Sequence, residues 1–378
     1  MSRLNLFTFN SERADSPRSL MLVGAWIVVS LVVIDVLINI FFHYPTDPNV
    51  INPSQLQSYF EYGRSSEGKL ARMTRADPSQ TAPITLSGWY EPLEVVQKTT
   101  ETQNPVVTFY GMSHAVQLAN ALGRVSDRYI ARSVGAPGAT PNWSYGAFLR
   151  DHGGGKSRVV VLAFMSANLP MITSMSPMTW NIDFPMPYTA DRFYLDRGQL
   201  KVIHPPFESF EQYVQAFSDP VKWSAARDLL AKNDAMYNSL IMRQTFLDNS
   251  SLFRLVRRAY GQRFVRNVSH GVLDRTGFNP DSEQIKIVNK IVQQFAEQAR
   301  KDGMLPVIYI VNNLGYSDYM FQAIKLTLEA DNIPYLSSHT VASPSDPRKY
   351  LPNSHFTDAV DEELAHALVK LMNKLLPQ

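Results

Sequence analysis

The sequence predicts an α/β fold built on a parallel sheet of five strands. From residue 105 onward, short apolar runs alternate with stretches of helical period, which is typical of parallel strands joined by helices. The run at 158–164 reads Arg-Val-Val-Val-Leu-Ala-Phe, without apolar–polar alternation. A β-branched run of this kind indicates a strand that is buried on both faces of its sheet.

The elements follow from these runs in chain order. We expect strands at residues 106–111, 129–133, 158–164, 305–311 and 333–336. We expect helices at 114–122, 281–302, 318–330 and 358–376, and a mixed helical stretch at 55–73. The polar stretches 76–83 and 99–105 indicate loops ahead of the domain.

Residues 170–280 interrupt the alternation between the third and fourth strands. The first half of this segment is rich in Pro, Met and aromatic residues, and the second half has a helical pattern. We interpret it as a mainly helical insertion at the carboxyl edge of the sheet, where parallel α/β proteins usually build ligand specificity. An ordinary packing subdomain is compatible with the same pattern.

The segment 20–42 predicts a transmembrane helix. It carries one charge, that of Asp35, and at 1.5 Å per residue it extends roughly 34 Å, which is enough to cross a bilayer. It ends in Phe-Phe-His-Tyr-Pro, which is unlike the small residues of a signal-peptide cleavage site. We therefore expect an uncleaved anchor.

The charges on either side of this segment predict its orientation. Arg3, Arg13 and Arg18 precede it, and no Lys or Arg follows until Arg64, so the positive-inside rule places the N-terminus in the cytoplasm. We expect a single-pass protein of a bacterial inner membrane whose C-terminal domain is periplasmic. The expected parts are a cytoplasmic tail at 1–19, the anchor at 20–42, a periplasmic stalk and lead-in at 43–104, and the α/β domain at 105–378.

Two polar residues lie within the anchor. Asp35 and Asn39 are four residues apart and therefore share one face of a helix. Polar groups in a membrane span usually meet a partner or a water-filled cavity. Two readings stay open: the anchor docks on another membrane protein, or both side chains lie close enough to the outer end to reach the interface.

Composition excludes several classes of function. The chain has 378 residues, a formal net charge of +2 and no cysteine. The small net charge gives no electrostatic case for nucleic-acid binding. The lack of cysteine excludes disulfides, thiol nucleophiles and Cys-ligated zinc. The eight histidines show no metal-ligand spacing, so we expect no metal and no cofactor.

Ser113 and His355 are the candidate nucleophile and base. Ser113 follows the first strand at the start of a helix, in Gly-Met-Ser-His, where Gly111 permits a tight turn. A serine at such a position is also an ordinary helix N-cap. His355 precedes the last helix. Because the carboxyl ends of parallel strands meet at one edge of a sheet, the two side chains can come together, and histidine can activate a serine hydroxyl.

Two further residues follow neighbouring strands at the same edge. Gly138 lies in Val-Gly-Ala-Pro-Gly-Ala-Thr after the second strand, and Asn168 lies in Met-Ser-Ala-Asn after the third. The backbone N–H of Gly138, the amide of Asn168 and the N–H of Ser113 could form an oxyanion hole. Each residue taken alone is an ordinary turn residue.

The ordered set of Ser, Gly, Asn and His resembles the SGNH (GDSL-like) hydrolase family. Gly-Met-Ser-His resembles the family's Gly-Asp-Ser block, and the segments around Gly138 and Asn168 resemble its glycine and asparagine blocks. Pro-Asn-Ser-His-Phe resembles the closing block and assigns His355 as the base. The resemblance covers residues 105–170 and 303–378, and it implies a three-layer α/β/α fold with a flavodoxin-like five-stranded sheet.

The chain departs from the family pattern at the acid. The family carries an acid two or three residues before the histidine, where this sequence has Asn353 and Pro352. Asn353 can orient an imidazole but cannot stabilise its cation as a carboxylate does. Asp346 and Asp358 are the candidates to supply the charge; otherwise the site is a Ser–His dyad or an inactive relative.

The resemblance implies an acyl-ester enzyme of the cell envelope. Outward-facing, membrane-tethered members of this type look like O-acetyltransferases or acetylesterases of envelope or secreted polysaccharides. They often work beside a multi-pass membrane acyltransferase, which would be the partner of Asp35 and Asn39. The alternative is a catalytically degenerate SGNH-fold subunit that binds or assembles a polysaccharide-modification complex, and Asn353 is the residue that favours it.

Two other motifs have weaker interpretations. Gly-Gly-Gly-Lys-Ser at 153–157 echoes a phosphate loop, but it precedes a strand and lacks the earlier glycine. An acid-free stretch of arginines interleaved with aromatic residues could contact anionic polysaccharide or lipid head groups, or could be a solvated helix face. Its arginines are Arg254, Arg257, Arg258, Arg263 and Arg266.

Overall fold

The computed structural model of the chain describes residues 17–45, 53–74, 87–90, 104–151 and 157–376. Most of the predicted cytoplasmic tail lies outside these residues. So do most of the Gly-Gly-Gly-Lys-Ser turn and of the two polar segments before the domain.

The central sheet has five parallel strands. They are β1 (Val106–Gly111), β2 (Ile130–Gly135), β3 (Val159–Met165), β8 (Leu305–Val311) and β9 (Tyr335–Ser337). Their order across the sheet is β2-β1-β3-β8-β9, and every neighbouring pair is parallel. Numbered among themselves, the strands have the order 2-1-3-4-5 of flavodoxin-like sheets. The predicted sheet is therefore confirmed.

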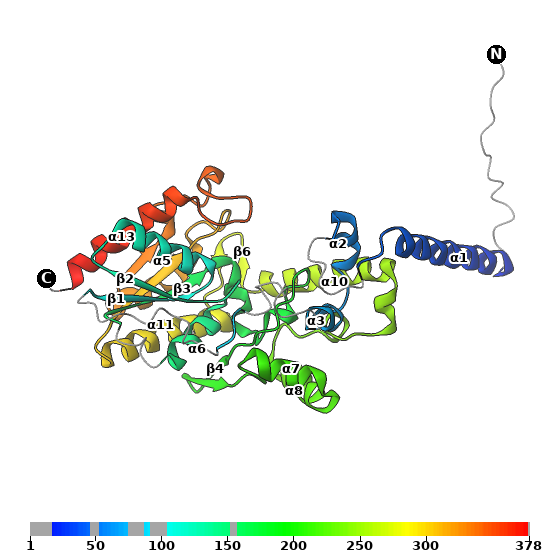
Figure 1. The fold of residues 1–378 in the computed structure, drawn as a ribbon, viewed down its shortest axis with the longest axis horizontal. Helices are drawn as coiled ribbons and strands as arrows, with labels where there is room; N and C mark the ends of the chain where they lie inside the picture. Colours follow the sequence, from blue (N-terminus) through cyan, green and yellow to red (C-terminus); the bar gives the residue numbers. More distant parts are fainter. Residues whose placement is uncertain (1–16, 46–52, 75–86, 91–103, 152–156, 377–378) are drawn as a thin grey trace, which may run out of the picture.

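Helices cover both faces of this sheet and make three layers (Figure 1). One layer holds α5 (Ser113–Val125) and α13 (Asp358–Leu375), which pack against each other. The opposite layer holds α6 (Pro141–Arg150), α11 (Glu283–Lys301) and α12 (Tyr319–Ala330). In α11, Ser282 caps the N-terminus, and Val288, Val292 and Phe295 lie on its buried face, as the helical period of the sequence indicates.

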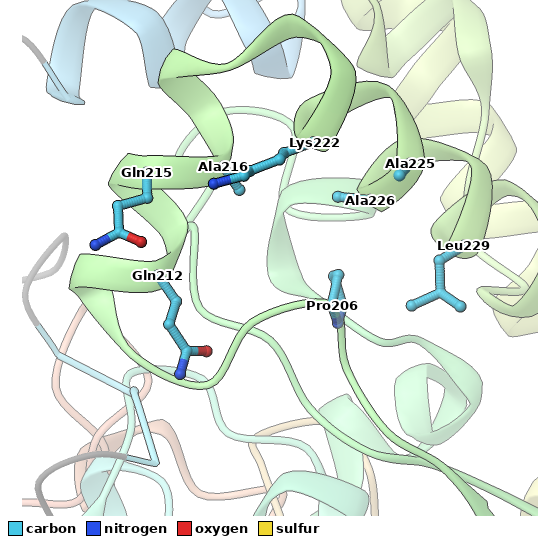
Figure 2. Close-up of a pocket in the computed structure, with 8 residues that line it drawn as sticks. All are labelled: Pro206, Gln212, Gln215, Ala216, Lys222, Ala225, Ala226 and Leu229. Atoms are coloured by element: carbon cyan, nitrogen blue, oxygen red, sulfur yellow. The ribbon is translucent and has the colours of Figure 1, made fainter.

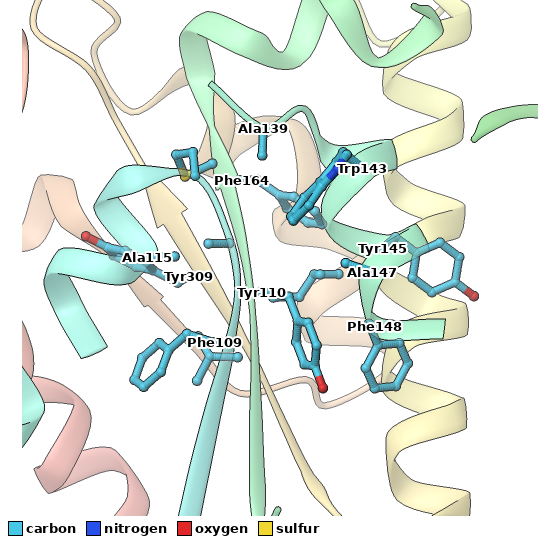
Figure 3. Packing of buried hydrophobic residues seen from close by; sticks show 14 of the residues in the cluster. Phe109, Tyr110, Ala115, Ala139, Trp143, Tyr145, Ala147, Phe148, Phe164 and Tyr309 are labelled. Atoms are coloured by element: carbon cyan, nitrogen blue, oxygen red, sulfur yellow. The ribbon is translucent and has the colours of Figure 1, made fainter. Parts of the chain in front are cut away.

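Consecutive side chains of β1 fill the core on opposite sides of the sheet. Figure 3 shows Phe109 on the side of Ala115 in α5, and Tyr110 on the side of Phe148 in α6. The Phe148 ring in turn meets Phe295 of α11 at a centroid distance of 4.8 Å. Burial on both faces explains why the inner strands β1, β3 and β8 have continuously apolar sequences.

The segment between β3 and α11 is mostly helical. Its helical elements are η2 (Ser166–Thr173), η3 (Pro177–Thr179), α7 (Phe210–Ser218), α8 (Pro220–Asn233), α9 (Ser239–Met242), η4 (Phe246–Asn249) and α10 (Ser251–His270). It also holds two small antiparallel ribbons that the sequence analysis did not predict. These are β4 (Arg192–Asp196) with β5 (Gln199–Ile203), and β6 (Leu273–Asp274) with β7 (Gly277–Phe278).

The lead-in packs into the fold where the sequence analysis expected a stalk. It contains α2 (Gln55–Glu61) and α3 (Ser66–Thr74), and Leu70 of α3 is fully buried. Further along, Trp89 contacts Tyr213 of α7 at 5.6 Å between ring centroids. Leu70, Trp89 and Tyr90 of the lead-in therefore belong to the hydrophobic core of the protein.

The N-terminal helix α1 (Pro17–Phe41) is long and apolar enough to cross a membrane. Its two polar side chains contact the start of α10. Asp35 Oδ1 accepts a hydrogen bond from the backbone N–H of Leu252 at 2.8 Å. Asn39 Oδ1 accepts from Ser251 Oγ at 2.8 Å and from Arg254 Nη2 at 3.1 Å. Both groups thus have partners within the chain, an arrangement that neither sequence reading anticipated.

The arginine stretch is largely internal. Arg254 and Arg257 are buried in α10 and pair with Glu61 of α2 and Asp248 of η4. Arg258 pairs with Asp183 at 2.7 Å. Both sequence interpretations, an anion-binding surface and a solvated face, are wrong for these three residues. Arg263 and Arg266 are exposed.

Candidate active site

Ser113 is the first residue of α5, directly after β1. The N-cap of α5 is Met112, whose side chain makes no capping hydrogen bond and is fully buried. Ser113 is therefore not the N-cap, which was the ordinary alternative for a serine at this position. Its hydroxyl stands at the N-terminal end of a helix of 13 residues, where backbone N–H groups and the helix dipole favour negative charge.

Glycines let α5 approach the sheet closely beside Ser113. A Cβ atom on Gly111 would lie 2.7 Å from the Cβ of Ala163 in β3, and one on Gly135 would lie 2.6 Å from Cγ2 of Val116 in α5. Gly111 and Gly135 pair across β1 and β2. The requirement at Gly111 is thus close packing between β1 and β3, whereas the sequence analysis attributed it to a tight turn.

His355 lies in a tight loop between the short helix η6 (Pro347–Lys349) and α13. The backbone N–H of Leu351 donates to the carbonyl of His355 at 2.7 Å, and Tyr350 pairs with Phe356 as an isolated bridge. Within the loop, Ser354 has a φ of 68°, which is uncommon for a residue other than glycine. The fully buried Phe356 fixes the loop to the core.

Ser113 and His355 meet at the carboxyl edge of the sheet. The distance from Ser113 Oγ to His355 Nε2 is 2.6 Å, across 242 residues of chain. Partial burial lowers the pKa of His355 below its usual value, so the imidazole is neutral at pH 7 and can accept a proton. This is the geometry of a nucleophile next to its base.

The other imidazole nitrogen, His355 Nδ1, is buried and has no hydrogen-bond partner among the described residues. The side chain of Asn353 instead accepts from the backbone N–H of His355 at 3.3 Å. Asp346 caps η6 and pairs with Arg348. Asp358 is in the first turn of α13. None of these three predicted orienting residues forms a hydrogen bond with the imidazole, so the site is a Ser–His dyad in this structure.

His114 is the neighbour that the sequence analysis did not assign. Its ring stacks on the ring of His355 at a centroid distance of 4.8 Å and an interplanar angle of 25°. Burial, together with the adjacent His355, lowers the pKa of His114 to about 4. A histidine directly after the candidate nucleophile was the signal that could have pointed to it.

Gly138 and Asn168 are brought together as the sequence analysis expected. Gly138 has a φ of 64°. The side-chain amide of Asn168 donates to the carbonyl oxygens of Gly138 and Ala139 at 2.9 and 3.3 Å. In this structure Asn168 thus holds the Gly138 turn in place. Whether either residue donates to an oxyanion stays a prediction.

Two asparagines that the sequence analysis missed tie the loops of this edge together. Asn313 Oδ1 accepts from the backbone N–H of Ala167 at 3.0 Å, next to Asn168. The carbonyl of Asn312 accepts from the hydroxyl of Tyr350 at 3.0 Å. Both asparagines directly follow β8. Their position after a predicted strand was the same signal that singled out Gly138 and Asn168.

A pocket of about 520 Å³ lies elsewhere, between α7 and α8 in the insertion (Figure 2). It is lined by Pro206, Gln212, Gln215, Ala216, Lys222, Ala225, Ala226 and Leu229. None of the candidate catalytic residues lines it, so it is not the site of the Ser–His pair.

No family model and no curated protein matches this chain. Its structure is similar to that of the "putative acylhydrolase" of Bacteroides fragilis NCTC 9343, with a TM-score of 0.39 and 10% identity over 76% of this chain and 99% of that one. It is also similar to a GDSL-like lipase from Bacteroides thetaiotaomicron VPI-5482, with a TM-score of 0.36 and 11% identity over 75% and 95% of the two chains. At these scores and identities the likeness carries no argument about activity.

Proposed function

We propose that this protein is a serine-dependent acyl-ester enzyme with Ser113 as nucleophile and His355 as base. The observation that carries the proposal is the distance of 2.6 Å between Ser113 Oγ and His355 Nε2. Supporting it, Ser113 stands at the N-terminus of α5, where a developing oxyanion is stabilised, and the pKa of His355 is lowered.

The chemistry follows from this geometry. Ser113 Oγ attacks the ester carbonyl carbon while its proton moves to His355 Nε2. The tetrahedral intermediate collapses, and the leaving alcohol takes the proton from His355 as the acyl group remains on Ser113. Water or an acceptor hydroxyl then attacks the acyl-serine with His355 again as base. The N–H groups of Ser113 and Gly138 and the amide of Asn168 are the proposed oxyanion donors.

Hydrolysis of p-nitrophenyl acetate by the full chain in detergent micelles tests the proposal. We expect Ser113→Ala and His355→Ala to lower kcat by about 10³-fold or more, because each removes one member of the pair. The matched control is Ser126→Ala, since Ser126 is the C-cap at the opposite end of α5. It should hydrolyse the ester at the wild-type rate.

The second candidate function is a binding or assembly subunit that kept the fold without turnover. The observation that favours it is the lack of a described partner for His355 Nδ1, since a triad acid stabilises the imidazolium. Equal rates for the wild type and Ser113→Ala in the ester assay would overturn the enzyme proposal and support this one.

We further propose that α1 is a retained membrane anchor with the C-terminal domain outside the cytoplasm. Its length and apolar composition support a membrane span. The hydrogen bonds of Asp35 and Asn39 to α10 support retention, because cleavage after residue 42 would remove both partners. The intact mass of the protein purified from membranes tests this, and a mass lacking residues 1–42 would contradict it.

The proposed substrate is an acylated envelope or secreted polysaccharide, with acetyl transfer or acetyl-ester hydrolysis as the reaction. The family resemblance of the sequence motifs supports this choice. A multi-pass membrane acyltransferase remains the proposed partner. Its contact with the anchor would be apolar in character, since Asp35 and Asn39 are bonded to α10.

A further inference from the structure

We propose that His114 is the positioning residue of this site and holds the His355 imidazole in the orientation that a triad acid would otherwise impose. The inference rests on the proposed roles of Ser113 and His355. It deepens them by naming what replaces the acid. The third member of a Ser–His–acid triad fixes the ring and tautomer of the base and stabilises its cation. The contacts of His114 suit the first of these tasks, which is to fix the ring of the base.

The ring of His114 packs between His355 and Phe356. The His114 ring lies nearly parallel to the His355 ring, at 4.8 Å and 25°. The edge of Phe356 meets His114 at 5.2 Å and 79°. His114 itself is 3% exposed, so its ring cannot move without disturbing the core. A flat, immobile surface against one face of His355 limits rotation of that imidazole.

His114 also forms a hydrogen bond with the loop that carries His355. His114 Nε2 is 3.2 Å from the carbonyl oxygen of Ser354. A carbonyl only accepts, so this nitrogen carries the proton and donates. The bond joins the residue after the nucleophile to the residue before the base. It therefore fixes the His355 loop at its strained residue, Ser354, whose φ is 68°.

His114 carries no charge at working pH. Burial keeps it neutral at any pH above about 4, so it does not repel a proton on His355. Its ring covers one face of the His355 imidazole, and burial lowers the pKa of that base, which keeps the imidazole neutral and able to accept the proton of Ser113.

The surroundings contain few other titratable groups. On α5, His114 itself faces His355. From the loop before α13, Asp346 is paired with Arg348. From α13, Asp358 and Asp361 are the nearest carboxyls in sequence, and neither contributes to the lowered pKa of His355, which is due to burial.

Three substitutions separate the two contacts of His114. His114→Phe keeps a flat ring against His355 and removes the bond to Ser354. His114→Gln keeps a donor at the position of Nε2 and removes the ring. His114→Ala removes both. Thermal unfolding of each full-length variant in micelles shows whether the variant is folded. If His114→Ala does not fold, His114→Phe and His114→Gln still test the proposal.

The readout that does not need turnover is the titration of His355, followed by NMR of ¹³C-labelled histidine in the full chain and assigned with His355→Ala. We expect His114→Ala and His114→Gln to raise the pKa of His355 toward the ordinary value of about 6.5, because the ring that buries one face is lost. We expect His114→Phe to leave it low. An unchanged titration in both the Ala and Gln variants would overturn the proposal.

The kinetic readout is the split between kcat and KM for p-nitrophenyl acetate. We expect kcat to fall by about 10–100-fold in His114→Ala and His114→Gln with KM within about threefold, since a misplaced base slows chemistry and leaves substrate binding intact. His114→Phe should retain most of kcat. A wild type without turnover would reject the proposed function, while the NMR titration would still decide the role of His114.

Discussion

At the scale of single residues, Asp361 is a buried carboxyl group outside the Ser–His pair. Its side chain in α13 is 2% exposed, and its Oδ1 atom has no hydrogen-bond partner among the described residues. The hydroxyl of the buried Tyr309 in β8 is likewise without a partner there. Burial, with a smaller effect of Asp358, raises the pKa of Asp361 to about 7.

This shift predicts a pH-dependent stability. The folded protein holds a proton on Asp361 up to pH 7, whereas the unfolded chain releases it near pH 4. The folded state therefore binds more protons between these values, and the contribution of Asp361 to stability falls as the pH rises through that window. We expect Asp361→Asn to raise the melting temperature by about 2–4 °C at pH 8 and to change it little at pH 4.

Thermal unfolding of the full chain in micelles at the two pH values provides the measurement. The control is Asp358→Asn on the exposed side of the same helix turn, which should be neutral or slightly destabilising because it removes a charge from a helix N-terminus. Equal effects of Asp361→Asn at both pH values would contradict the assignment.

The residues of the candidate site could be predicted where chain order alone decides their place. Ser113, Gly138 and Asn168 each follow a strand of the sheet, and strand ends converge whatever the loops do. The orientation of a ring within a loop is a different matter. His114 faces His355 because of the turn at Ser354, and no pattern in the sequence encodes that turn.

At the scale of elements, the contact between α1 and α10 is a helix cap supplied by another helix. The first N–H groups of a helix have no partner within it. In α10, Ser250 accepts from the N–H of Phe253 at 3.1 Å, and Asp35 of α1 accepts from the N–H of Leu252 at 2.8 Å. The carboxylate of Asp35 also suits the positive end of the helix dipole.

Removing this cap should loosen the start of α10. We expect Asp35→Ala combined with Asn39→Ala to speed amide exchange at Leu252 about fivefold, which corresponds to the loss of about 1 kcal/mol of capping free energy. Hydrogen exchange with mass spectrometry on the full chain in micelles measures it. Ser30→Ala, an exposed polar site elsewhere on α1, is the control, and unchanged exchange in the double variant would contradict the cap.

Strands and helices could be predicted where burial against a neighbouring layer of the fold sets the spacing of apolar residues. The inner strands β1, β3 and β8 are buried on both sides and read as apolar runs, whereas the edge strand β2 is only partly buried. The β4–β5 ribbon was missed although its two-residue turn is Arg197-Gly198, with φ values of 51° and 78°. That pairing of positive angles is typical of a tight hairpin. The ribbon was missed because its strands have only five residues each and lie outside the main sheet.

At the scale of the whole molecule, the lead-in packs against both the α/β domain and the insertion. Tyr90 stacks on Trp143 of α6 at 5.8 Å and 16°. Glu67 of α3 accepts from the indole N–H of Trp223 at 2.8 Å, across 156 residues of chain. The burial of Leu70, Trp89 and Tyr90 within the expected stalk and lead-in at 43–104 could not be predicted, because the residues that bury them lie far away along the chain.

A chain that starts at residue 105 should therefore fail to form a stable fold. It would lose the burial of Leu70, Trp89 and Tyr90, each worth about 1.5–3 kcal/mol, and their sum is comparable to the total stability of a typical domain. We expect this chain to aggregate. A chain that starts at residue 44 keeps these residues and should be soluble and show cooperative thermal unfolding. Similar unfolding curves for the two chains would refute the prediction.

The contact between α1 and α10 also limits the positions and orientations that the Ser–His pair can adopt relative to the membrane. A domain on a flexible tether sweeps a volume that grows with tether length, and its reactive face points in every direction. Here α10 lies between α1 and the α/β domain (Figure 1), and hydrogen bonds join it to the anchor. With α1 in a bilayer, the sheet edge that carries Ser113 and His355 would stay at one distance from the membrane surface and in one orientation. Substrates that reach this distance from the membrane would meet the Ser–His pair at a high effective concentration.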